Sequence, residues 1–128
     1  KPGVANPYVI VDAAMNDLIR PTLYEAHHEI WPVTETASDM APVQQDVVGP
    51  VCETGDYLAL DRALPSFRPG DLMAVMTAGA YGAAMSSTYN SRLLVPEVLV
   101  KGGAYAVIRP RQTYDDLIAA DKLPGWLK

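Results

Sequence analysis

The chain has 128 residues, of which 49% are hydrophobic and 20% are charged, a composition typical of one globular domain rather than a disordered segment. Its net charge of −5 at pH 7 argues against the basic surface that nucleic acids and anionic membranes require. No apolar run approaches the roughly 20 residues of a membrane span. A single cysteine allows no intrachain disulfide, so we expect a cytoplasmic protein.

The first predicted elements are a strand and a turn of helix. The β-branched run from Tyr8 to Ala13 predicts a buried strand. A turn of helix is expected to open near Pro21, where a missing backbone N–H costs little, with Asn16 or Asp17 as a cap before it.

The middle of the chain is predicted to be extended. Glu29 to Val33 alternates weakly and predicts a second strand. Thr34 to Gln45 is polar, aperiodic and rich in turn formers, so an exposed loop is expected there. Asp46 to Cys52 and Tyr57 to Leu60 are predicted to be extended again.

After the Pro-Gly turn that follows Arg68, Leu72 to Met76 predicts a strand, and the small residues after it predict a short helix. Pro96 to Val100 and Ala104 to Ile108 flank the sequence KGG, which is typical of a β-hairpin turn.

The tail begins with Thr113 and Asp116 in the spacing of a capping box, so it predicts a short helix. Short strands dominate, and turns separate them at roughly ten-residue spacing. We therefore expect one mainly-β domain over residues 1–128, a small antiparallel barrel or sandwich with short helices.

The only thiol lies in a turn beside a carboxylate. Cys52 directly precedes Glu53, and turn-forming residues flank the pair. A carboxylate beside a thiol favours the protonated thiol, so this setting suits a proton donor better than a nucleophile. By residue type alone, a small buried core residue remains the competing interpretation of Cys52.

Four segments, VDAAMNDLIRPTLYEAHHEI, VVGPVCETGD, MTAGAYGAAMSSTYNSR and PEVLV, resemble in order the C-terminal end of diaminopimelate decarboxylases, a family of fold-type III pyridoxal-phosphate-dependent decarboxylases. The resemblance runs from about Tyr8 to the terminal helix. Thr54 stands where that family usually has Ser, and the hydroxyl is kept.

The resemblance implies pyridoxal 5′-phosphate as cofactor, meso-diaminopimelate as substrate, and L-lysine and CO₂ as products in the last step of lysine biosynthesis. It also implies a homodimer in which the cysteine–glutamate turn reaches the neighbouring subunit's active site. The family's lysine for the cofactor lies in an N-terminal (β/α)₈ barrel of roughly 250 residues, which this length cannot hold. With no initiator Met, the chain is expected to be a C-terminal part that supplies half a site and is inactive alone.

The resemblance also implies a role for each candidate residue. Cys52 is the proton donor to the substrate's α-carbon. Arg20 offers a planar fork to the distal carboxylate, Tyr24 adds a hydroxyl one helical turn later, and Glu53 holds the distal ammonium. Tyr81, among small residues, touches both cofactor and substrate.

The residue types also allow structural interpretations of these positions. Arg20 and Glu53 could serve in surface ion pairs, and Tyr24 and Tyr81 could be core aromatics. The whole could be a non-catalytic, dimerising β-domain such as that of the antizyme inhibitors, or belong to a decarboxylase of another basic amino acid. His27 and His28 are adjacent and are predicted to be structural, so no metal site is expected.

Overall fold

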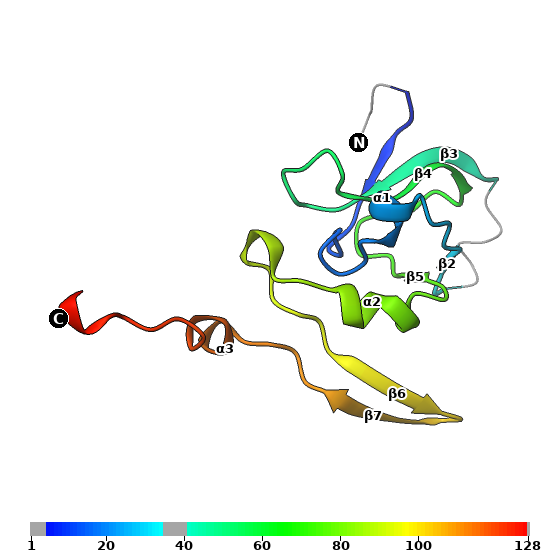
Figure 1. Cartoon of the computed structure of the whole chain (residues 1–128). Helices are drawn as coiled ribbons and strands as arrows, with labels where there is room; N and C mark the ends of the chain where they lie inside the picture. The colour runs from blue at the N-terminus through cyan, green and yellow to red at the C-terminus, as the bar shows by residue number, and fades with distance from the viewer. Residues whose placement is uncertain (1–4, 35–40, 128) are drawn as a thin grey trace. The chain divides into compact units, whose positions relative to one another are not determined.

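The computed structural model describes residues 5–34 and 41–127. The chain divides into two compact units, residues 1–86 and residues 87–128, and each is described by itself (Figure 1). The predicted mainly-β fold with a few short helices is confirmed.

The first unit contains a three-stranded sheet in the order β1–β3–β4 (Figure 1). Its strands are β1 (Tyr8–Ile10), β3 (Val43–Val48) and β4 (Tyr57–Leu64). β3 and β4 are antiparallel, whereas β1 runs parallel to β3. The parallel pair departs from the antiparallel pairing that short strands and close turns predicted.

A second, two-stranded antiparallel sheet pairs β2 (Ile30–Pro32) with β5 (Met73–Val75). Both sheets of this unit pack on one hydrophobic cluster, in which Val47 of β3 is fully buried and Ile30 of β2 is nearly so. The other buried members of the cluster are Leu18, Leu58, Ala59 and Leu64. Two open sheets on one core make a small sandwich, one of the two predicted forms.

Among its described residues, the first unit holds two short α-helices, α1 (Arg20–Tyr24) and α2 (Gly79–Met85). α1 opens with Pro21, as predicted, because proline fixes a helical φ where the N–H would have no partner. The predicted cap is wrong: Ile19 occupies the N-cap position without a side-chain bond, and Asp17 instead accepts a hydrogen bond from the backbone of Ala14.

The second unit consists of the hairpin β6 (Glu97–Lys101) and β7 (Ala104–Arg109), the helix α3 (Tyr114–Ile118), and two 3₁₀ turns, η2 (Tyr89–Ser91) and η3 (Gly125–Leu127). Gly102 takes a φ of +57° in the two-residue turn, which explains the preference for glycine there.

The predicted capping box at α3 is present. The Thr113 side chain accepts from the Asp116 N–H, and the Asp116 carboxylate accepts from the Thr113 backbone N–H and hydroxyl. The Thr113 side chain, and then its backbone, hold the pKa of Asp116 below its usual value. Both residues of the capping box lie within one turn of the helix, so the sequence alone is enough to predict it.

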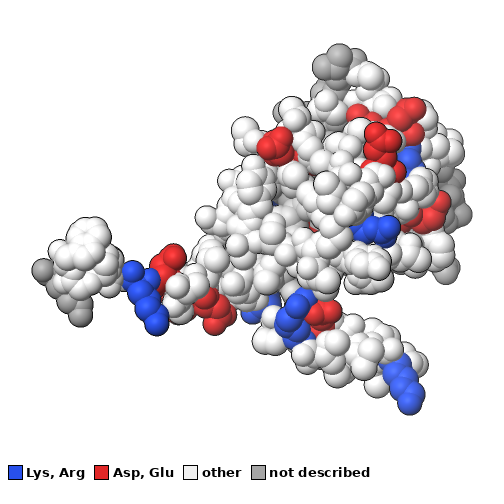
Figure 2. All heavy atoms as spheres, viewed as in Figure 1, with Lys and Arg blue, Asp and Glu red and all other residues white. Residues whose placement is uncertain are grey.

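The hairpin carries apolar side chains on both of its faces. Val98 pairs with Val107 on one face, and Leu99 pairs with Ala106 on the other. All of β7 is exposed, and Figure 2 shows that the hairpin surface is uncharged along most of its length, with charge at its ends.

Several predicted boundaries differ from the structure. β3 ends at Val48, so the last four residues of the segment predicted to be extended, Asp46 to Cys52, lie outside the strand. The strand predicted over Tyr8 to Ala13 is shorter and only half-buried. The last three residues of the loop predicted over Thr34 to Gln45 belong to β3. Residues 35–40 of that loop lie outside the described part of the chain. β4 continues past Leu60 to Leu64 through Asp61, whose φ of 49° interrupts the alternation. Across the two described ranges, no helix is long and apolar enough to cross a membrane.

Candidate active site

The Cys52–Glu53 turn joins β3 to β4, and both side chains are exposed. The Glu53 N–H donates to the carbonyl of Val51 (2.9 Å), and the Asp56 N–H donates to the carbonyl of Glu53 (3.1 Å). The Thr54 hydroxyl donates to the Glu53 carboxylate at 3.2 Å. The turn therefore presents a free thiol and an oriented carboxylate side by side.

A buried carboxylate follows the turn. Asp56 is 4% exposed, and each of its oxygens accepts a backbone N–H: Oδ1 from Met15 at 2.7 Å and Oδ2 from Val51 at 2.6 Å. The Gly49 N–H also donates to the Asp56 carbonyl (3.0 Å). A Cβ at Gly49 would lie 2.4 Å from Asp56 Oδ2, so this approach requires glycine.

Arg20 and Tyr81 are brought together by the two helices of the first unit. The Arg20 guanidinium carbon lies 5.7 Å from the centroid of the Tyr81 ring, within the range of a cation–π contact. Tyr81 is 62% exposed, so its hydroxyl and much of its ring remain accessible. The pair thus offers a cation and a phenol on one accessible surface.

The turn and α1 are linked at a second place. The Thr22 hydroxyl, from the middle of α1, donates to the carbonyl of Gly55. A Cβ at Gly55 would lie 2.8 Å from the Thr22 methyl group, which shows how closely the two segments approach. Helix and turn are therefore connected through Thr22 and Gly55.

Four of the five predicted site residues fall into two groups. Cys52 and Glu53 share the turn, and Arg20 and Tyr81 share the cation–π contact. Tyr24 lies at the end of α1 and is 61% exposed, so it is not the core aromatic of the competing interpretation. The two groups are joined through the backbone of the turn and the Thr22 side chain.

The adjacent histidines lie in opposite environments. His27 is exposed and lies 2.8 Å from Glu29, whose pKa is lowered, mainly by that hydrogen bond. His28 is 2% exposed, and its Nδ1 donates to the carbonyl of Met76 at 3.0 Å. In the described segments no three His, Cys, Asp or Glu side chains form a group that could hold a metal ion.

His28 holds the chain just before α2. The Met76 carbonyl also accepts the Thr77 hydroxyl at 2.8 Å, and Thr77 takes a φ of 52°, rare for a β-branched residue. Arg62 donates to the carbonyl of His28 at 2.9 Å and fixes that residue in turn. These bonds determine where α2, and with it Tyr81, begins.

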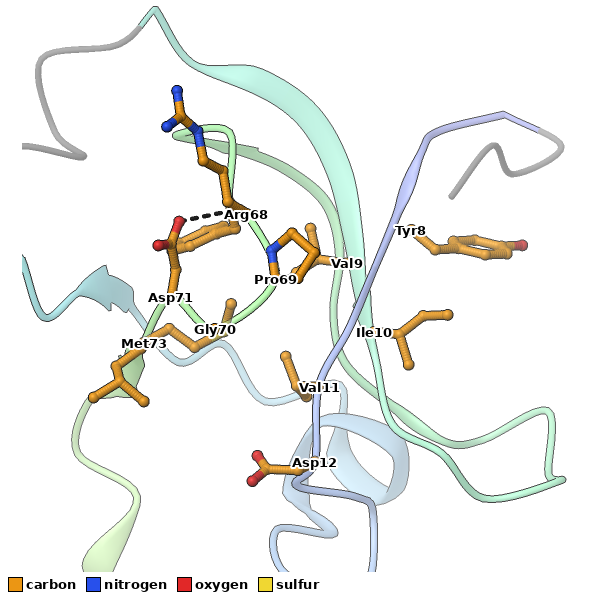
Figure 3. A pocket seen from close by; sticks show the side chains of 12 residues that line it. Tyr8, Val9, Ile10, Val11, Asp12, Arg68, Pro69, Gly70, Asp71 and Met73 are labelled. Carbon is orange, nitrogen blue, oxygen red and sulfur yellow. Dashed lines mark hydrogen bonds between the residues drawn. The ribbon is translucent and has the colours of Figure 1, made fainter.

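The first unit also has a pocket of about 530 Å³, lined by β1 and by residues 67–73 (Figure 3). Asp71 accepts the Arg68 N–H at 2.7 Å and closes the turn on one side. None of the five predicted site residues lines this pocket. Its position gives it no part in the candidate site.

Two supporting residues, Thr22 and Asp56, were missed by the sequence analysis, and His28, which was predicted to be structural, anchors α2. All three act over more than 30 positions of sequence. The only local signal was the pair of glycines, Gly49 and Gly55, around the turn. Glycines at these positions indicate that another segment of the chain comes close, but they do not indicate which segment.

Comparison with known protein families gives a match over residues 1–79. The matching family is described as pyridoxal-dependent decarboxylase, C-terminal sheet domain. The match includes the segment with Arg20 and Tyr24, and the Cys52–Glu53 turn, and it ends just before Tyr81.

Individual relatives extend the similarity to nearly the whole chain. A diaminopimelate decarboxylase of Zymomonas mobilis is 55% identical over 120 residues, which are 94% of this chain and 28% of that protein. The structure is similar to diaminopimelate decarboxylase from M. jannaschii in co-complex with L-lysine, with a TM-score of 0.88 and 35% identity over all of this chain and 29% of that one.

The enzyme of the same name from Helicobacter pylori, complexed with L-lysine, has a TM-score of 0.79 and 45% identity, over 88% of this chain and 27% of that one. The chain thus spans less than a third of the length of these relatives.

Proposed function

Because the chain belongs to the pyridoxal-dependent decarboxylases, as their C-terminal sheet domain, we propose that it supplies the C-terminal part of a diaminopimelate decarboxylase active site. The reaction would convert meso-2,6-diaminopimelate into L-lysine and CO₂. The observation that carries the proposal is the Arg20–Tyr81 contact, on an exposed surface connected to the Cys52–Glu53 turn.

Arg20 is proposed to bind the carboxylate at the spared end of the substrate. Its guanidinium lies over the Tyr81 ring, which leaves the planar N–H groups free to pair with a carboxylate in two parallel bonds. Tyr24, one helical turn on, adds an exposed hydroxyl. Glu53, oriented by Thr54, would hold the ammonium at that end.

Cys52 is proposed to protonate the substrate's α-carbon after CO₂ leaves. The thiol is exposed on the turn, so a substrate can approach it, and it is free of disulfide bonding. A positioned acid of this kind contributes about 10²–10⁴-fold to turnover.

The residues of this chain fit the pyridoxal cofactor in one respect. Tyr81 is exposed and follows Gly79 and Ala80, so a ligand can approach its hydroxyl closely. When bound, the cofactor supplies the electron sink for decarboxylation. We infer that Tyr81 contacts it, while its lysine comes from a further domain.

The proposal includes a homodimer in the cytoplasm, with the Cys52–Glu53 turn acting in the partner subunit's site. In this dimer, Arg20 and Tyr81 of one chain would form a site with the Cys52–Glu53 turn of the partner, so the two groups of each chain would serve two different sites. A lone cysteine without a disulfide favours the reducing compartment.

The test uses a hybrid enzyme, in which the matching 120-residue stretch of the Zymomonas mobilis protein is exchanged for that of this chain. We expect the hybrid to release CO₂ from meso-diaminopimelate and to form L-lysine. Cys52→Ala in the hybrid should slow turnover by about 10²–10⁴-fold and leave cofactor binding unchanged.

The alternatives give different results in the same assay. A folded hybrid that binds the cofactor but turns over no substrate would favour a non-catalytic, dimerising domain. Faster turnover of lysine or ornithine than of diaminopimelate would assign another basic amino acid. Unchanged turnover in Cys52→Ala would remove that residue from the chemistry.

A further inference from the structure

The Asp56 side chain accepts hydrogen bonds from both segments that carry the proposed chemistry. Its Oδ2 accepts the Val51 N–H, directly before Cys52, at 2.6 Å. Its Oδ1 accepts the N–H of Met15, five positions before Arg20, at 2.7 Å. The carboxylate is 4% exposed, so water replaces neither bond readily.

The Cys52–Glu53 turn is also bonded to the main chain of Asp56. The main chain of Asp56 donates to Glu53 and accepts from Gly49, at 3.1 and 3.0 Å. The turn thus closes on Asp56 through its backbone as well as through its side chain. A shift of the carboxylate would therefore move Val51 and the thiol that follows it.

The segment that leads from Met15 to α1 is also constrained. Asp17 and Leu18 both donate backbone N–H groups to the carbonyl of Ala14, which makes the segment a compact turn. Leu18 is buried in the core, four positions after Ala14. Because the segment is packed in this way, the position of Met15 helps to set where α1 and Arg20 begin.

We propose that Asp56 is a positioning residue, which holds the Cys52–Glu53 turn in a fixed place against the Arg20 segment. In the proposed dimer, one buried carboxylate then controls the placement of the proton donor in one site and of the group that grips the spared end of the substrate in the other. The inference rests on the proposed function for its kinetic consequences, and on the hydrogen bonds alone for its structural ones.

Asp56→Asn in the hybrid enzyme is the direct test. The amide has one acceptor and one NH₂ group, so in either orientation one backbone N–H faces a donor. We expect kcat to fall by about 10²-fold, the effect of a catalytic group misplaced by about 1 Å, and KM for diaminopimelate to rise several-fold. The solvent deuterium isotope effect on kcat should rise, because proton donation becomes the slow step.

Asp71→Asn is the matched control. It removes the same charge and a similar carboxylate bond, to the Arg68 N–H at 2.7 Å, in a part of the first unit without candidate residues. We expect its kcat, KM and isotope effect to match those of the unmodified hybrid. If Asp56→Asn loses activity only in proportion to its folded fraction, with KM and isotope effect unchanged, Asp56 is merely structural and the proposal falls.

A second readout is independent of turnover. Amide hydrogen exchange of the folded hybrid should become faster in residues 14–20 and in residues 49–56 together in Asp56→Asn, and in neither segment in Asp71→Asn. Unchanged exchange in either segment overturns the proposal. An inactive parent hybrid contradicts the proposed function instead, and the exchange measurement still decides the role of Asp56.

Discussion

Arg20 is placed to discriminate between substrates by the charge at their far end. Its guanidinium lies over the Tyr81 ring, so its position is fixed before a ligand arrives. In the hybrid, Arg20→Ala should raise KM for diaminopimelate by about 10²-fold, the scale of a lost charge-assisted pair of hydrogen bonds. Inhibition by cadaverine, a diamine of the same chain length that has no carboxylate, should change much less.

The comparison is made by steady-state kinetics with both ligands. Arg20→Lys serves as the control, because it keeps the charge and loses the planar fork, and an intermediate effect on KM is expected. Equal losses for diaminopimelate and cadaverine would show that Arg20 only supports Tyr81.

Gly49 is required by space rather than by backbone conformation. A methyl group there would lie 2.4 Å from Asp56 Oδ2, whereas Gly125 has nothing within 4 Å of the same position. Gly49→Ala in the hybrid should cost about 1–3 kcal/mol of stability, the usual range for overpacking, and Gly125→Ala should cost less. Urea unfolding measures both variants, and equal midpoints would contradict the close contact.

The candidate residues could be proposed from the sequence, and the residues that support them could not. Cys52, Glu53, Arg20 and Tyr81 carry distinctive side chains in recognisable local sequences. Asp56 lies in no such local pattern. Its partner Met15, 41 positions away, contributes only a backbone N–H. Nearly every residue has that group, so the residue type at position 15 does not indicate the bond.

At the scale of elements, His28 connects β2 to the start of α2. It donates to the Met76 carbonyl, and Thr77 follows with its unusual backbone. His28→Leu in the hybrid should lower the urea midpoint by the equivalent of about 1–3 kcal/mol, because a buried carbonyl loses its donor. His28→Asn, which keeps an N–H donor, should restore part of the loss.

The neighbouring His27 provides the control. It is exposed, and its hydrogen bond with Glu29 lies at the surface, so His27→Leu should change the free energy of unfolding by less than about 1 kcal/mol. Similar effects at the two histidines would contradict the anchoring role of His28.

Elements governed by local chemistry were predicted well. Pro21 opens α1, the box of Thr113 and Asp116 opens α3, and Gly102 turns the hairpin. The pairing of β1 with β3 was not predictable in the same way, because it joins segments nearly 40 positions apart. The end of β4 was missed because Asp61 breaks the alternation that marks a strand.

At the scale of the whole chain, we predict that residues 1–128 alone neither bind pyridoxal phosphate tightly nor decarboxylate diaminopimelate. Cys52, Glu53 and Tyr81 are exposed, and the chain has no sequence that resembles the family's cofactor lysine. Absorbance titration with the cofactor, borohydride reduction and mass spectrometry provide the test. A stoichiometric lysine adduct together with CO₂ release would refute the prediction.

The β6–β7 hairpin also bears on how samples of this chain behave in concentrated solution. Val98, Leu99 and Val100 on one strand and Val107 and Ile108 on the other form short β-prone stretches that are exposed here. Such stretches add to one another edge to edge and seed fibrils. Lys101 at the tip, and the ion pair of Glu97 with Arg109 (2.5 Å) at the base, are the charges that interrupt such stacking. Neutralising Lys101 would therefore remove a gatekeeper and shorten the time before fibres form.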